Sequence, residues 1–158
     1  MDAATQALYA AQALGNAPAA QQVQIVEDFF TYAVPVFTGL AAGASATNNV
    51  VIQADSDFVL EQITYTATIA NAAFTMNSRP IPNINILITD TGSGRQLMSS
   101  AVPIWTMCGS GEEPFELPRP KAFVARSTIA VQVSNFDAAV TYNLWISFVG
   151  RKLFRIGS

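Results

Sequence analysis

Residues 142–149, YNLWISFV, place an apolar or aromatic side chain at every second position. Tyr142, Leu144, Ile146 and Phe148 form one set, and the side chains between them form a second set that includes Trp145. Successive side chains of an extended strand point to opposite faces of a sheet. The spacing therefore predicts a strand with one face in the core.

The same alternation appears in residues 63–69, 84–88 and 129–133. Weaker candidates are residues 29–37, 50–54, 96–98 and 103–107. Clusters of Gly, Pro, Asn, Asp and Ser separate these segments, and no helical pattern lies between them. We therefore expect an all-β, antiparallel β-sandwich of about eight strands, with a jelly roll as the leading arrangement. A barrel and an immunoglobulin-like sandwich are the alternatives.

The N-terminal region has a different pattern. Residues 2–14 are rich in Ala and predict a short helix, with Asp2 near its N-terminus, and residues 17–22 predict a linker. A helix of this length is marginal alone in water. We expect residues 1–22 to form an arm that orders against a neighbouring subunit through Leu8 and Tyr9, and residues 23–158 to form the β-sandwich domain. A frayed terminus is the alternative.

The composition favours a subunit that neighbours cover. Hydrophobic residues make up 51% of the chain and charged residues 12%, whereas about 25% charged is usual. The longest weakly polar run, residues 33–44, is interrupted by Pro35 and Gly39 and is too short to span a membrane. The single cysteine and the lack of a basic N-terminal signal predict synthesis in a reducing cytoplasm.

The charges are distributed unevenly along the chain. Six acidic residues and no basic residue precede Arg79, and the rest of the chain has eight basic and five acidic residues. Complementary halves of this kind suit head-to-tail contacts between subunits, although a charge-poor chain also gives such a split by chance. The only basic cluster, Arg151, Lys152 and Arg155, is expected to be a solvated tail. Nucleic acid is therefore not an expected partner.

The residues argue against an enzyme and against a cofactor or metal site. The chain has no histidine, and Cys108 is expected to be a small packed hydrophobe. Residues 86–92, ILITDTG, resemble the active-site loop of aspartic proteases, but such enzymes need two carboxylates, and a chain with one copy of the motif could supply them only as a homodimer. The stretch around Asp90 is expected to be a hairpin loop instead. Residues 55–57, DSD, are expected to form a turn.

Two regions are candidates for contact with other subunits. Pro114, Pro118 and Pro120 predict a long, stiff loop over residues 112–121. Trp145 either completes the core or anchors a partner, and a glycan is a further possible ligand for it. Trp105 is open to the same two interpretations. Within these regions we expect contacts from Glu112, Glu113, Phe115, Arg119, Lys121 and Trp145.

The order of several motifs resembles that of small virion proteins of tailed bacteriophages. These motifs are residues 54–58 (ADSDF), 93–97 (SGRQL), 114–120 (PFELPRP), 134–135 (SN) and 148–152 (FVGRK). The resemblance implies a jelly-roll decoration, or cement, protein on the capsid surface of the virion. It implies a homodimer or homotrimer whose partner is the major capsid protein. A neck, tail or head-fibre component is the alternative.

Overall fold

The computed structural model describes residues 2–6, 23–72 and 80–156. The chain forms two compact units, Met1–Val26 with Arg155–Ser158, and Glu27–Phe154. In the first unit residues 3–6 are helical, and the Thr5 amide donates to Asp2 Oδ1 at 2.8 Å. The rest of the predicted helix, with Leu8 and Tyr9, and the predicted linker lie outside the described residues.

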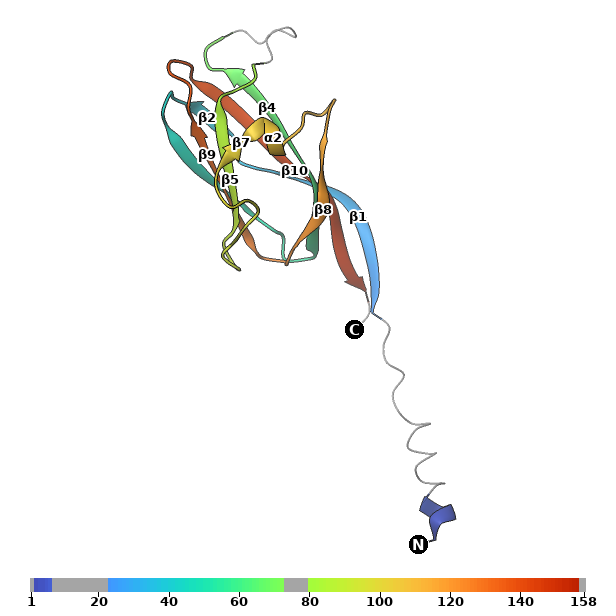
Figure 1. Cartoon of the computed structure of the whole chain (residues 1–158). Helices are drawn as coiled ribbons and strands as arrows, with labels where there is room; N and C mark the ends of the chain where they lie inside the picture. The colour runs from blue at the N-terminus through green and yellow to red at the C-terminus, as the bar shows by residue number, and fades with distance from the viewer. Residues whose placement is uncertain (1, 7–22, 73–79, 157–158) are drawn as a thin grey trace. The chain divides into compact units, whose positions relative to one another are not determined.

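The second unit is built from strands, which confirms the expected all-β class (Figure 1). The elements are β1 (Gln24–Ala33), β2 (Phe37–Leu40), β3 (Ser45–Val51), β4 (Asp57–Ile69), β5 (Ile84–Asp90), β6 (Arg95–Gln96), β7 (Val102–Pro103), α2 (Ile104–Met107), β8 (Phe115–Phe123), β9 (Thr128–Asn135) and β10 (Tyr142–Ile156).

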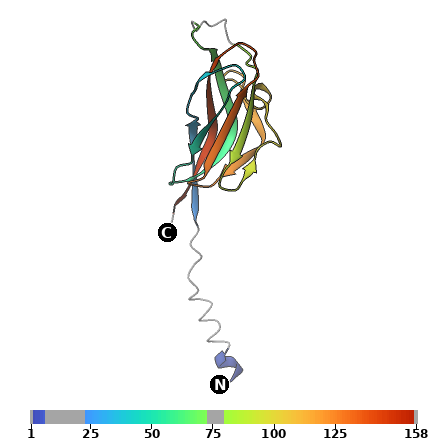
Figure 2. The same ribbon diagram turned by 90° about the vertical axis from the view of Figure 1, so that its left-hand side faces the viewer.

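The strands form two five-stranded sheets. One has the order β1-β10-β4-β8, with β2 also paired to β10, and the other has the order β3-β9-β5-β6, with β7 paired to β5. The pairing is nested, because β2 pairs with β10, β3 with β9, β4 with β8 and β5 with β6, all antiparallel. Figure 2 shows β10 (red) beside β4 (green) after a quarter turn. The chain thus follows one long hairpin whose arms alternate between the two sheets.

The core contains the alternating apolar residues that the sequence analysis assigned to it. Ile84, Ile86 and Ile88 of β5 and Ile146 and Phe148 of β10 are at most 2% exposed and belong to one cluster. Each such side chain contributes roughly 1.5–3 kcal/mol when it is fully buried. The expected burial of Cys108 is confirmed at 3% exposed. Burial raises the pKa of its thiol to about 12.

A β-bulge at Glu61 of β4 brings the two strands close together, while the inward alternation of β10 continues past it from Phe148 to Lys152. The register between β10 and β4 shifts between Val149 and Gly150. A Cβ on Gly150 would lie 1.9 Å from the carbonyl oxygen of Val59, so only glycine fits here. Beyond the bulge, Lys152 is buried and Arg151 lies on the opposite, outer face.

The expectation of a solvated basic tail is therefore wrong for these two residues. Lys152 donates to Asp55 and to Gln53 Oε1, and its ammonium lies 4.2 Å from the centre of the Phe30 ring. The hydrogen bond from Lys152 lowers the pKa of Asp55. A buried ammonium needs such partners because the loss of hydration is costly. The β10 strand continues through this segment instead of ending before it.

Three further segments differ from the prediction for local reasons. Pro35 lacks an amide hydrogen and divides the predicted strand 29–37 into β1 and β2. Residues 103–107 form the end of β7 and the one-turn helix α2, in which Ile104 is fully buried and Trp105 is 56% exposed. The predicted loop 112–121 is mostly β8, where an edge position tolerates Pro118 and Pro120.

Buried Asn135 joins three parts of the chain at the end of β9. Its Nδ2 donates to the carbonyl oxygens of Leu40 at 3.0 Å and Val140 at 2.8 Å. Its Oδ1 accepts from the Asp137 amide at 2.9 Å. The carboxamide thus satisfies backbone groups at the end of β2 and in the loop between β9 and β10.

Candidate functional site

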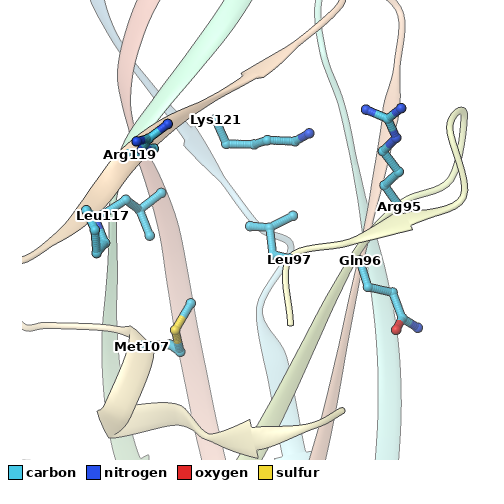
Figure 3. A pocket seen from close by; sticks show the side chains of 8 residues that line it. Arg95, Gln96, Leu97, Met107, Leu117, Arg119 and Lys121 are labelled. Carbon is cyan, nitrogen blue, oxygen red and sulfur yellow. The ribbon is translucent and has the colours of Figure 1, made fainter. Parts of the chain in front are cut away.

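A groove of about 500 Å³ lies where the edge strands β6 and β8 of the two sheets face each other. Figure 3 shows Arg119 and Lys121 on β8, Arg95 on β6, and apolar side chains between them. We call it the cationic groove. Its lining residues are Arg95, Gln96, Leu97, Met107, Leu117, Pro118, Arg119 and Lys121.

The β8 wall exists because β8 bulges away from its neighbour. Lys121 pairs with Leu60 and Glu116 pairs with Gln62, so four β8 residues lie opposite a single β4 residue. Two of the four are Pro118 and Pro120, which have no amide hydrogen to donate to β4. The bulge directs Leu117 and Arg119 to the groove.

The facing wall is the hairpin between β5 and β6. The Asp90 carboxylate closes its turn by accepting from Ser93 Oγ at 2.7 Å and from the Gly92 amide at 3.2 Å. The hydrogen bond from Ser93 is the main reason that the pKa of Asp90 is lowered. Gly94 has a positive φ of 66°, which glycine adopts without strain. The predicted hairpin is therefore present, and Asp90 has a structural role in it.

The floor of the groove is apolar. Leu97, Met107 and Leu117 are partly buried and pack against the main core. The buried side chain of Ile104 anchors α2, which carries Met107. A flexible thioether beside two leucines can adapt to an inserted apolar or aromatic group.

The cations of the groove make no ion pair within the part of the chain that the structure describes. Lys121 lies 5.9 Å from the centre of the Phe123 ring, and its charge contributes to lowering the pKa of Asp90 from beyond ion-pair distance. By contrast, Arg151 Nη1 lies 2.6 Å from Glu27 Oε2. Three cations around an apolar floor suit an anionic group attached to an apolar one.

A second charged surface lies at the far edge of the β1–β8 sheet. It is a shallow hollow formed by Glu27, Asp28 and Phe29 of β1 with Glu61, Gly150 and Arg151. We call residues 27–29 the acidic edge. Phe29 is 77% exposed, and Asp28 makes no ion pair with any described residue.

The predicted contact residues lie on several surfaces. Arg119 and Lys121 line the groove, and Phe115 begins β8 at 37% exposed. Glu112 and Glu113 are exposed in the turn before β8. Trp145 is 41% exposed on the outer face of its sheet, opposite Thr66. It is therefore not a core residue.

Six groove residues were not among the candidate contact residues: Arg95, Gln96, Leu97, Met107, Leu117 and Pro118. The excess of basic residues after Arg79 was the available signal for Arg95. Nothing in the sequence indicated that the hairpin would face residues 117–121. The groove depends on the proximity of two sheet edges, which follows from the topology.

Two absences hold for residues 2–6, 23–72 and 80–156. These residues contain no group of three or more His, Cys, Asp or Glu side chains that could hold a metal ion. They also contain no helix that is long and apolar enough to cross a bilayer.

Comparisons with protein-family models, with curated proteins and with solved structures found no match to this chain.

Proposed function

We propose that the protein is a structural component of a tailed-bacteriophage virion, a decoration or cement protein that binds the major capsid protein. We also propose that its sandwich is a jelly roll. The nested pairing supports this, because a jelly roll is a double-sheet Greek-key arrangement with that strand order. The resemblance of the motifs around β6, β8 and β10 to virion proteins supports the placement on a phage.

The observation that carries the proposal is the exposed tryptophan on the sheet formed by β1, β10, β4 and β8. Trp145 lies on the outer face of β10, and its strand neighbours on that face and on β4 include Ser147, Thr64 and Thr66. The patch around the indole is thus uncharged and rests on a rigid pair of strands. Tryptophan in such a setting is a typical anchor of protein–protein interfaces.

The mechanism would be mass action. A protein that binds only the assembled shell stabilises that shell by the free energy of binding. Weak contacts that repeat over a lattice reinforce one another when each oligomer binds several capsid subunits at once. The low charge content of 12% leaves much of the surface suited to being covered.

Copy number tests the location. Quantitative mass spectrometry of purified virions should find this protein in numbers comparable with the major capsid protein. A single ring of copies would instead support the neck, tail or head-fibre alternative. Its absence from the virion would refute both.

The role of Trp145 can be tested by binding to capsids that lack the protein. Trp145→Ala should reduce binding by roughly 30-fold or more, as expected for an interface anchor. Val124→Ala is the matched control, because Val124 is 70% exposed and lies outside this face. Both variants should keep the wild-type melting temperature within a few degrees. Equal binding by Trp145→Ala and wild type would overturn the assignment of this face, and binding to a glycan array would favour a carbohydrate ligand.

A further inference from the structure

The cationic groove and the acidic edge have complementary chemistry. The groove offers Arg95, Arg119 and Lys121 around an apolar floor, and the acidic edge offers Asp28 next to a 77% exposed Phe29. Asp28 and the three groove cations make no ion pair with any described residue. Glu27, by contrast, already pairs with Arg151.

We propose that the cationic groove binds the acidic edge of a second copy of this chain. The Asp28 carboxylate would pair with the groove cations, for which an arginine guanidinium such as that of Arg119 has the matching fork geometry. Phe29 follows Asp28 in β1 and points to the other face of the strand, so its ring would pack against the rim of the groove while the carboxylate enters it. A cavity of about 500 Å³ has room for the Asp28 side chain.

The contact would be made by side chains and not by extension of the sheet. An added strand would need amide donors along the free edge of β8, and Pro118 and Pro120 have none. The bulge at these residues also bends the edge away from a straight ladder. A side chain can therefore enter the groove beside β8, whereas a strand cannot pair with the edge of β8.

The two surfaces also determine the symmetry of the assembly. β1 and β8 are the opposite ends of the sheet order β1-β10-β4-β8, so one copy cannot use its own acidic edge to fill its own groove. Each copy instead gives its edge to one neighbour and accepts the edge of another. Such a head-to-tail contact is heterologous, and it closes into a ring when the rotation between copies permits. This inference does not depend on a capsid partner.

A charge-reversal set tests the contact in solution by analytical ultracentrifugation. The wild-type chain should self-associate, and Asp28→Arg and Arg119→Glu should each weaken association by at least roughly tenfold. The double variant Asp28→Arg/Arg119→Glu restores opposite charges across every interface and should recover association. Phe29→Ala should also weaken it. Glu113→Arg makes the same charge change as Asp28→Arg at an exposed position outside both surfaces, and it should associate like wild type.

Recovery in the double variant separates a lost contact from a folding defect, because two destabilising changes would not compensate each other. Far-UV circular dichroism should show wild-type secondary structure for all variants. A wild-type chain that stays monomeric at high micromolar concentration would overturn the proposal. A double variant that self-associates no more strongly than either single variant would also overturn it. The proposal would equally fail if the single variants self-associated like wild type while the groove bound an acidic peptide from another protein.

Discussion

Replacing Gly150 by alanine should destabilise the domain strongly. The added Cβ would lie 1.9 Å from the Val59 carbonyl oxygen and 2.9 Å from its carbonyl carbon. Ordinary van der Waals contact begins at 3.4 Å, so the two strands would have to separate locally by about 1.5 Å. The obstacle is backbone in the middle of a sheet, which a rotamer change cannot move.

The cost can be worked from this separation. Overpacking costs about 1–3 kcal/mol. Moving β4 and β10 apart also weakens two or so ladder hydrogen bonds, at about 1 kcal/mol each. We expect Gly150→Ala to lower the free energy of unfolding by about 3–5 kcal/mol, which corresponds to a fall in melting temperature of about 10 °C or more for a domain of this size.

Thermal unfolding followed by circular dichroism measures the effect, with Gly111→Ala as the matched control. A Cβ on Gly111 meets nothing within 4 Å, so this variant should unfold within about 1 kcal/mol of wild type. If Gly150→Ala behaves like Gly111→Ala, the close approach of β10 to β4 at the bulge is wrong.

Three further predictions concern buried polar and ionisable groups. Asn135→Leu leaves three backbone groups without partners and should cost about 3 kcal/mol in urea denaturation; a loss below 1 kcal/mol would contradict the hydrogen bonds described. Because the folded-state pKa of Asp90 is lowered, its carboxylate stabilises the fold above the unfolded-state pKa of about 3.9, and this contribution is lost as the pH falls through the folded-state value. Asp90→Asn should therefore lower the melting temperature more at pH 7 than at pH 2, and a difference independent of pH would refute the assignment. Cys108, with its raised pKa and buried thiol, should react with iodoacetamide at pH 8 only as fast as the protein unfolds, whereas labelling at the rate of a free thiol would show an accessible side chain.

Strands that bury one face were predictable because alternation is a local property. The segments around Ile86, Val131 and Ile146 each show it in the sequence, and each is a strand with the expected inward face. Residues 112–121 were predicted as a loop because their prolines exclude a central strand, and residues 115–123 form the strand β8. Whether a strand is central or at an edge is decided by the topology, which local patterns do not contain.

The candidate surfaces were less predictable than the fold. Arg119 and Lys121 were predicted as contact residues, but on a loop, and no residue was predicted to lie beside them. Arg95 joins them only because β6 and β8 end their respective sheets on the same side. Likewise, Lys152 is buried because β10 extends beyond residue 149 with the same inward alternation as Ile146 and Phe148, and the acceptors that make a buried ammonium possible come from residues far away in the sequence.

The position of β10 has a consequence for biosynthesis. This strand pairs with β1, β2 and β4, all of which are translated long before it. A nascent chain that ends before residue 142 therefore exposes strand edges and apolar faces that only β10 can cover. At a translation rate of about 5–20 residues per second, these edges and faces stay uncovered for several seconds before β10 is synthesised. The sheet assembles after synthesis of residues 142–156, so a nonsense codon or ribosome stall in β9 leaves an aggregation-prone fragment and not a smaller sandwich.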